Sequence, residues 1–304
     1  MISYAQNCED VLLRRAFPDL RGGFYIDVGA NDPFVDSVTK HFSLEGWRGI
    51  NVEPQVELYQ KICEDRPNDV NLNVGVSDRA STIEFMQCLS NSGLSTFCPK
   101  VAEERALTGL EYARRTIPVM TLAEICEAHV KGPIDFLSID VEGFEREVII
   151  GNDWNRWRPR IVVVEATRPE RWEPLLHAAN YLSATFDGIN LFYVRGEEPE
   201  LLKAVKAPVH VLDDYIRRPM HEYVTAIRAD STNVRAYAAQ LEAELARVRA
   251  AAECSERALA EARRSLSLNS ALGPNALKIA HRLHNLSIKH PKLARSFRRV
   301  AGLG

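Results

Sequence analysis

Short apolar runs alternate with helix-like stretches through the first part of the chain. The apolar runs, several of them apolar on both faces, predict strands at residues 24–28, 49–52, 70–76, 134–139, 160–164 and 191–194. Helix-like segments fall between many of them, at residues 36–44, 57–65, 122–129, 145–151 and 174–179. Buried strands that alternate with helices are typical of an α/β fold with a mostly parallel sheet. Ligands of such sheets bind beyond the carboxyl ends of the strands, so the residues after each strand are the candidates for a site.

The distribution of glycine divides the chain. No glycine lies between Gly196 and Gly273, and the strand-like runs all come before residue 219. We therefore predict an α/β domain over residues 1–218, a long helix or coiled coil over 219–270, and a basic, partly helical tail over 271–304.

The net charge of −3 hides an asymmetry. Residues 271–304 carry seven Lys and Arg and no acid, which leaves 31 basic and 41 acidic residues in 1–270, a net of −10. An acidic body with a basic tail argues against a nucleic-acid partner. It allows the tail to meet an anionic membrane surface or an acidic partner.

Composition places the chain among ordinary globular proteins, with 46% hydrophobic and 26% charged residues. No apolar run approaches the roughly 20 residues that span a bilayer. The first ten residues lack the basic start and apolar core of a secretory signal. The six cysteines form no CxxC pair, which predicts free thiols in a reducing compartment and neither disulfides nor a zinc site. We expect a cytoplasmic protein and leave open a peripheral contact with the inner membrane.

The first predicted strand ends in a turn that suits a ligand other than a dinucleotide. Residues 25–33 read YIDVGANDP and lack the second and third glycines of GxGxxG. Gly29 lets the backbone approach a ligand closely, and Asp27 can accept a hydrogen bond from an ammonium group or water. The alternative is an ordinary strand-to-helix turn with a structural glycine.

The second and third predicted strands also end in acids. Glu53 lies 26 residues after Asp27, the distance of one βαβ step, and can accept hydrogen bonds from both hydroxyls of a ribose. Asp78 follows the third strand and can accept from an adenine amine, although a surface turn explains it as well.

Three acids surround the end of the fourth predicted strand, in the sequence IDVEGFE. Asp140 is expected to point into the crevice, whereas Glu145 is better explained as a charge in the first turn of the next helix. For Glu142 the two interpretations are balanced. Glu165 closes the fifth strand and is another crevice candidate, and Asp187 belongs more simply to an Asp-Gly turn.

Several of these segments together resemble one known family. The run GGFYIDVGANDPFVDSVTKHFSLEGWRGINVEP, followed by FLSIDVEGFEREVIIG and FDGINLFYV, is similar to the FkbM family of S-adenosylmethionine-dependent methyltransferases. The resemblance covers about residues 1–195. It implies a class I methyltransferase (Rossmann-like) fold, with a seven-stranded, mostly parallel sheet, one antiparallel edge strand and helices on both faces. It also implies O-methylation, often of sugars, glycolipids or other natural products.

The resemblance assigns roles to individual residues. By position, Asp27, Gly29 and Asn31 look like the turn that holds the methionine end of the cofactor. Glu53 looks like the ribose acid and Asp78 like the residue at the adenine edge. Asp140 is similar to the acid beside the transferred methyl group, which makes it a cofactor-binding residue as well.

The catalytic base is inferred from chemistry. A sugar hydroxyl has a high pKa, so a nearby group must accept or polarise its proton. Asp140 and Glu142 are the candidates, and His41 is a weaker one because a single histidine on a helix is more often a surface residue. A Mg²⁺ ion is conceivable at Asp140 and Glu165 but is not favoured, because two carboxylates do not define a metal site.

The C-terminal extension has strong helix composition, with 11 alanines among the 33 residues 234–266. A heptad seam holds over five repeats, with Ala238, Leu245, Ala252, Leu259 and Leu266 at a and Val234, Leu241, Val248, Ser255 and Ala262 at d. This pattern favours self-association into a dimer or trimer, with a single exposed helix as the alternative.

Gly273 and Pro274 then interrupt the helix. Apolar residues between 276 and 286 fall on roughly one face, with basic residues elsewhere, which suits an anionic membrane surface, docking on a partner such as a glycosyltransferase, or a merely solubilising tail.

The functional hypothesis is an S-adenosylmethionine-dependent O-methyltransferase of glycan biosynthesis, acting on a glycan or glycolipid hydroxyl. One alternative is a nucleotide- or NAD-binding oxidoreductase, against which the missing GxGxxG argues. The other is a non-catalytic scaffold of a glycan-assembly complex that works through its coiled coil.

Overall fold

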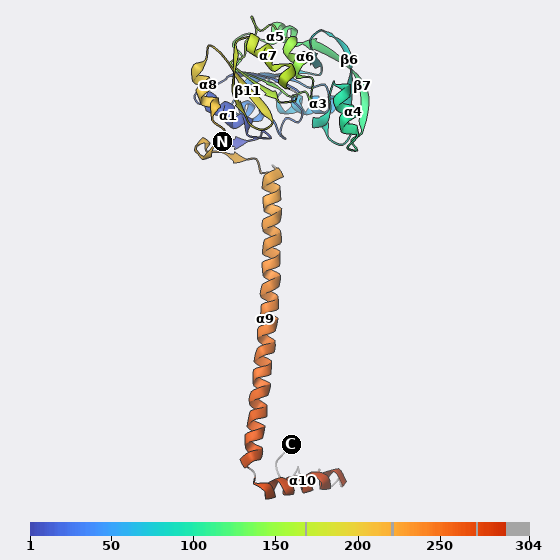
Figure 1. Cartoon of the computed structure of the whole chain (residues 1–304), viewed down its shortest axis with the longest axis vertical. Helices are drawn as coiled ribbons and strands as arrows, with labels where there is room; N and C mark the ends of the chain where they lie inside the picture. Colours follow the sequence, from blue (N-terminus) through green and yellow to red (C-terminus); the bar gives the residue numbers. More distant parts are fainter. Residues whose placement is uncertain (168, 220–221, 272, 290–304) are drawn as a thin grey trace. The chain divides into compact units, whose positions relative to one another are not determined.

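A computed structural model describes residues 1–167, 169–219, 222–271 and 273–289 (Figure 1). By their internal contacts the residues form two units, Met1–Thr225 and Ala226–Gly304. The first unit is an α/β domain, and the second contains two helices.

A mixed seven-stranded sheet forms the centre of the first unit. Its strands lie in the order β10 (Tyr181–Phe186), β11 (Asn190–Arg195), β9 (Ile161–Glu165), β8 (Phe136–Ile139), β2 (Phe24–Val28), β3 (Arg48–Val52) and β4 (Val70–Leu72). Neighbouring strands from β9 to β4 are all parallel, as the alternating pattern predicts.

The position of the antiparallel strand differs from the expectation. β11 is antiparallel to both β9 and β10, so the reversed strand is the second from the edge and not the edge strand itself. The reason is the tight turn at Asp187, which makes β10 and β11 a hairpin, and β11 then pairs with β9 on its other side. Expecting the reversed strand at the edge was therefore wrong.

Helices cover both faces of this sheet, because alternate residues of each strand point to opposite faces. Ile26 and Val28 pack in a layer with α5 (Leu122–His129), α6 (Glu145–Ile150) and α7 (Glu173–Ala178). Tyr25 packs in the other layer with α1 (Glu9–Ala16), α2 (Lys40–Leu44) and α8 (Pro199–Lys206).

A second, three-stranded sheet lies beside the first. It consists of β5 (Gly75–Ser77), β6 (Ser81–Cys88) and β7 (Tyr112–Thr121), and the η1 turn (Ser92–Leu94) and α4 (Pro99–Ala106) connect β6 to β7. The single strand expected over residues 70–76 is therefore two strands in different sheets. The Asn73 side chain marks the break, because its amide donates to the carbonyls of Glu53 at 2.9 Å and Pro54 at 3.0 Å.

Shorter elements complete the first unit: α3 (Val56–Asp65), the pair β1 (Ile2–Ser3) and β12 (Ile216–Arg217), η2 (Pro169–Arg171) and η3 (Val211–Asp213). The helix expected over 36–44 begins only at Lys40. Asp36 has a positive φ of 56°, which ends any helical path through that residue.

The second unit contains most of α9 (Glu222–Ala271), which begins shortly before the boundary, and α10 (Pro274–Lys289). Residues 290–304 of the predicted basic tail lie outside the described residues. No helix in the described ranges has the length and apolarity that a bilayer crossing requires. All six cysteines are free thiols, as expected.

Candidate active site

The turn after β2 brings the ends of three neighbouring strands together. The backbone N–H groups of Gly29 and Ala30 donate to the carbonyl of Val52 in β3, at 3.0 and 3.1 Å. Gly29 has a φ of 86°, and a Cβ there would lie 1.8 Å from the carbonyl oxygen of Asp140. No other residue fits at this position, since the close approach of two backbones leaves no room for a side chain.

Glu53 connects this turn to the next strand end. One carboxylate oxygen accepts from the backbone N–H of Asn31 at 2.8 Å, and the other accepts from that of Gln55 at 2.8 Å. Each oxygen keeps a further lone pair that a ligand hydroxyl can use. The side chain is buried, and burial raises the pKa of Glu53 to about 7, against the opposing effect of these hydrogen bonds.

A cleft of about 540 Å³, including its open mouth, lies over these strand ends. Five of the predicted site residues line it: Gly29, Asn31, Glu53, Asp140 and Glu142. Much of its remaining wall is apolar: Val76 and Phe85 belong to the second sheet, Val74 directly precedes β5, and Phe97 lies in the connection between β6 and β7. The cleft therefore has a floor of polar residues at the strand ends and a wall that is mostly apolar.

Three carboxylates gather at one side of the cleft. Asp140, Glu142 and Glu165 each offer an oxygen, and these oxygens lie within 4.8 Å of one another. Asp140 is exposed to the open cleft. Desolvation by the surrounding protein, and then the charges of Glu165 and Glu142, raise its pKa well above the ordinary range. Burial also raises the pKa of Glu165, whose carboxyl group hydrogen-bonds with Asp140. When two carboxyl groups lie this close, the state in which they share one proton is favoured over the state in which both are ionised.

Arg105 of α4 supplies positive charge to this cluster. Its Nη2 donates to Oε2 of Glu142, and its Nη1 donates to the carbonyl of Leu94 at 3.2 Å. Burial and the charge of Glu165 nevertheless raise the pKa of Glu142 to about 7. Glu142 also has a positive φ of 55°, an uncommon backbone conformation for a residue other than glycine. The hydroxyl of Thr96 donates to its carbonyl at 2.8 Å and holds this turn in place.

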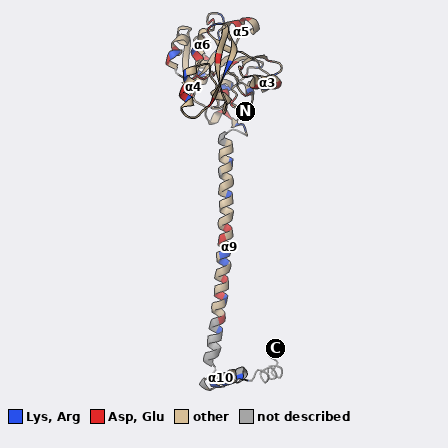
Figure 2. Cartoon of the chain, turned by 90° about the vertical axis from the view of Figure 1, so that its right-hand side faces the viewer, with Lys and Arg blue, Asp and Glu red and all other residues tan. Residues whose placement is uncertain are grey.

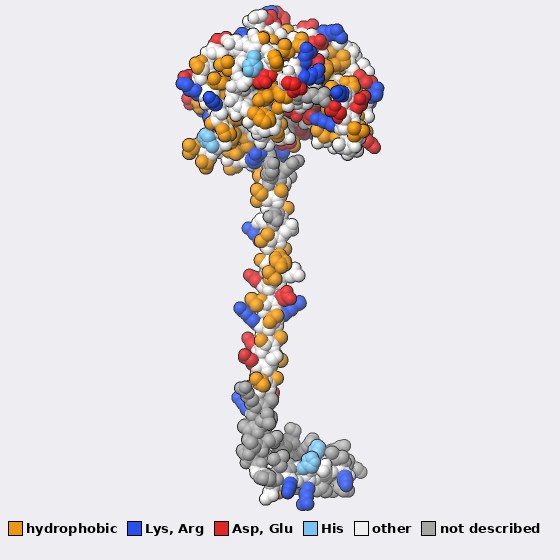
Figure 3. All heavy atoms as spheres, viewed as in Figure 1, with side chains coloured by type: hydrophobic (Ala, Val, Ile, Leu, Met, Phe, Trp, Pro, Cys, Tyr) orange, Lys and Arg blue, Asp and Glu red, His pale blue; other side chains and the backbone are white. Residues whose placement is uncertain are grey.

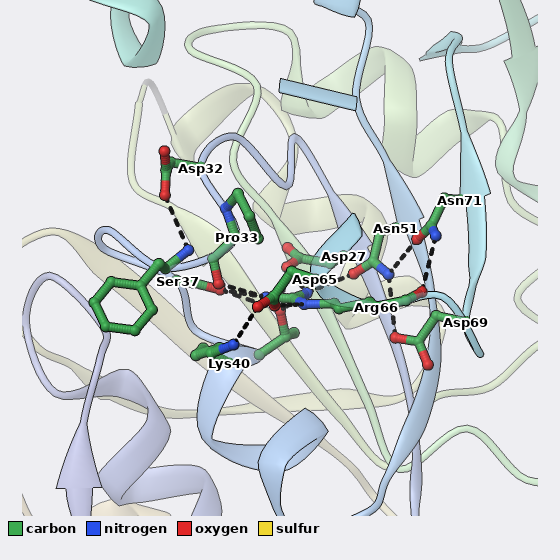
Figure 4. A network of polar contacts seen from close by, with 12 residues as sticks. Asp27, Asp32, Pro33, Ser37, Lys40, Asn51, Asp65, Arg66, Asp69 and Asn71 are labelled. Atoms are coloured by element: carbon green, nitrogen blue, oxygen red, sulfur yellow. Dashed lines mark hydrogen bonds and ion pairs between the residues drawn. The ribbon is translucent and has the colours of Figure 1, made fainter. Parts of the chain in front are cut away.

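Asp27 lies on the opposite face of its strand and does not line the cleft. Its carboxylate accepts from the Thr39 hydroxyl at 2.6 Å and lies 4.0 Å from a guanidinium nitrogen of the buried Arg66 (Figure 4). Asn51, its register partner in β3, accepts from the same guanidinium at 2.6 Å. Because strand side chains alternate, Asp27 and Asn51 share a face that Val28 and Val52 do not.

Arg66 also holds the segment that follows Asn31. Its Nη2 donates to the carbonyl of Pro33 at 3.1 Å and to the Ser37 hydroxyl at 2.8 Å (Figure 4). Asp27 and Arg66 therefore support the turn from behind. Burial raises the pKa of Asp27, and the guanidinium opposes that rise.

The other candidates lie apart from the cleft. Asp78 is exposed, and its carboxylate accepts from the hydroxyl of its neighbour Ser77 at 3.2 Å. Asp187 accepts from the backbone N–H groups of Ile189 and Asn190, which makes it a turn residue, as expected. Glu145 is buried and accepts from the Gly143 N–H at 2.7 Å at the start of α6.

His41 is buried on α2 and does not line the cleft. Burial lowers its pKa, which favours the neutral imidazole.

Sequence reasoning missed Arg105 and the aromatic wall. The segment 86–115 is polar and contains no motif that marks it as part of a site. Nothing in the spacing of Phe85, Phe97 and Arg105 indicates that they meet the strand ends, because their positions depend on how β6 and β7 pair.

Comparison with known protein families explains why these features occur together. The family described as the methyltransferase FkbM domain matches residues 27–190, more than half of the chain. The chain belongs to the FkbM methyltransferase family. The matched range of this FkbM methyltransferase includes the cleft residues described above and Glu165 of the carboxylate cluster, and it excludes α9 and α10. A search among curated proteins found no match.

Proposed function

We propose that this FkbM methyltransferase uses S-adenosylmethionine to methylate a hydroxyl group of a sugar, a glycolipid or a related natural product. Membership of the family supports methyl transfer, and the cleft supports this choice of donor and the need for a base.

The residues of the cleft fit the donor. Gly29 lets the turn after β2 lie directly against the backbone of Asp140, and both residues line the cleft. Glu53 can accept hydrogen bonds from the two ribose hydroxyls, and the Asn31 N–H holds its carboxylate in orientation. Phe85 and Phe97 offer aromatic surface to an adenine ring.

The carboxylate pair Asp140 and Glu165 carries the proposal for the chemistry. When bound, the donor supplies an activated methyl group on a positively charged sulfur, so the protein has mainly to align the reactants. The ionised form of Asp140 accepts the proton of the acceptor hydroxyl as the new carbon–oxygen bond forms. The methyl–sulfur bond breaks at the same time, and neutral S-adenosylhomocysteine leaves. A base whose pKa is raised above the ordinary carboxyl range is suited to this task, and Glu165 stabilises the protonated form through its hydrogen bond.

Glu142 is assigned a supporting role in the acceptor half of the site. Its contact with Arg105 keeps a charged pair beside Asp140, where a polyhydroxylated acceptor can form hydrogen bonds with both side chains. A hydroxyl acceptor is preferred over a neutral amine because a hydroxyl needs the base that the cluster provides.

Calorimetric titration with S-adenosylhomocysteine tests the donor assignment. We expect micromolar binding by the wild-type protein and no binding of NADH at the same concentrations. If the folded protein binds neither ligand, the donor assignment is wrong and a scaffold role is favoured. Binding of NADH alone supports the oxidoreductase alternative.

Transfer of a labelled methyl group to a panel of sugars, nucleotide sugars and glycolipids tests the acceptor class. A product whose label is on an ether oxygen supports the proposal. A product methylated at nitrogen or carbon, with no turnover of hydroxyl acceptors, refutes it.

A further inference from the structure

The long helix α9 carries an apolar seam that the described residues leave exposed. Leu241 and Leu245 are 47% and 50% exposed, and Val234, Val248 and Leu259 are 54% to 61% exposed. Figure 3 shows hydrophobic side chains along this helix. A long amphipathic helix is normally stabilised by burial of its apolar face, and the exposed seam of α9 lacks this burial.

The exposed residues keep a strict heptad spacing. Val234, Leu241 and Val248 occupy successive d positions, and Leu245 and Leu259 occupy a positions. Ile227, which is 69% exposed, lies one heptad before Val234 and extends the d series toward the start of α9. A repeat of seven residues is the period at which two helices can keep one seam in contact. Leu266 and Ala262, the last predicted seam positions, lie outside the side chains described.

The charges beside the seam fit a second copy of the same helix. Glu244 occupies a g position, and Arg249 occupies the e position of the next heptad. In a parallel, in-register pair these two residues face each other across the seam, once on each side. The neighbouring g positions hold Tyr237 and Ala251, so that arrangement brings no like charges together.

Those flanking charges have no ion-pair partner in the described ranges of the chain. Glu244 and Arg249 form no salt bridge there, whereas Arg257 pairs with Glu253 four residues earlier, outside the seam. Figure 2 shows acidic and basic residues interspersed along α9. The unpaired g and e charges are therefore available to a neighbouring helix.

We propose that α9 associates with α9 of a second copy of this chain as a parallel, in-register coiled coil. The seam of Ile227, Val234, Leu241, Leu245, Val248 and Leu259 forms the interface, and Glu244 pairs with Arg249 of the other copy. Alanine at positions 238 and 252 makes the interface weaker than one built from large residues throughout, so the association is reversible.

The mass of the full chain in solution tests this proposal. By sedimentation, the wild-type protein is expected at a multiple of 34.2 kDa, in equilibrium with the monomer at low concentration. Leu241→Glu and Leu245→Glu should each weaken association roughly 100-fold or more, because every copy loses a buried seam side chain. Ala243→Glu and Ala250→Glu place the same charge at f positions and should leave the mass unchanged.

Charge exchange tests the parallel register. Glu244→Arg and Arg249→Glu each create like-charged contacts in the parallel pair and should weaken association roughly 3- to 10-fold. The double variant restores opposite charges and should recover the wild-type constant. A monomeric wild-type protein, an unchanged mass in the Leu241→Glu variant, or a double variant no better than the single ones would overturn the proposal. Binding of S-adenosylhomocysteine by each variant checks that the first unit is folded.

Discussion

The backbone N–H of Asn31 donates to Oε2 of Glu53 at 2.8 Å, across the ends of the neighbouring strands β2 and β3. This hydrogen bond ties the Gly29 turn to the proposed ribose acid, so that one carboxylate both shapes the cleft floor and faces the ligand.

Replacing Glu53 by Gln should weaken binding of S-adenosylhomocysteine roughly 10- to 100-fold, the loss expected for hydrogen bonds to a charged group. In the wild type both carboxylate oxygens accept hydrogen bonds, from the backbone N–H groups of Asn31 and Gln55. The amide places an NH₂ group, which is a donor, opposite one of these N–H groups. Titration calorimetry measures the change. Glu57→Gln, an exposed site four residues later, is the control and should bind like the wild type. Equal affinity in the two variants would exclude Glu53 as the ribose acid.

Asp140→Asn should reduce kcat roughly 10²- to 10⁴-fold while binding of S-adenosylhomocysteine changes much less. The amide keeps the shape of the side chain but cannot accept the hydroxyl proton. Asp19→Asn, at an exposed site outside the cleft, is the matched control and should keep the wild-type kcat. A proportionate loss of binding and kcat in Asp140→Asn would indicate a structural role.

Arg105→Met should move the acidic limb of the pH–rate profile upward by roughly one unit or more, since an adjacent opposite charge lowers a carboxyl pKa by that amount. The pKa of Glu142 is already about 7 with Arg105 present, so its loss raises the value further. Activity that requires ionised Glu142 is then lost at a higher pH. Arg105→Lys retains the charge and should keep most of the wild-type profile. An unshifted profile in Arg105→Met would show that Glu142 does not control the rate.

Treatment with EDTA should leave methyl transfer unchanged. The oxygens of Asp140, Glu142 and Glu165 are close enough to surround a cation, but the guanidinium of Arg105 already lies against Glu142 and supplies positive charge to the cluster. Turnover before and after chelation, with and without added Mg²⁺, decides the question. Loss of activity that Mg²⁺ restores would make the cluster a metal site.

Glu9→Gln should make thermal stability less sensitive to pH. Burial raises the pKa of Glu9 to about 8, so the folded state holds a proton that the unfolded chain releases above about 4.5. This stabilisation is complete at low pH and is lost as the pH rises through 8. Between pH 5 and 8 the wild-type Tm should therefore fall several degrees more than that of the variant, because 1 kcal/mol corresponds to roughly 2–4 °C at this domain size. Glu57→Gln should follow the wild type, and parallel curves for Glu9→Gln would contradict the assignment.

The central strands were predictable because their signal is local. Buried strands such as 24–28 and 161–165 are mostly apolar, and an acid or a turn residue stands at or directly after the end of each. The break between β4 and β5 was not predictable, since Val70 to Val76 is apolar enough for one strand and only the contacts of Asn73 divide it. The reversed strand was misplaced for a similar reason. The sequence shows the hairpin turn at Asp187, but it does not show which other strand pairs with β11.

The sequence by itself determined the class of fold, the acids at the strand ends and the family, because strand periodicity and the IDVEGFE and DVGAN segments are properties of contiguous residues. Tertiary structure decided which of those acids share the cleft. Asp27 points away from it because side chains alternate along β2, whereas Asp140, Glu142 and Glu165 meet because parallel strands end at the same edge. The contact between Arg105 and Glu142 links residues 37 positions apart and depends on the folded path of α4.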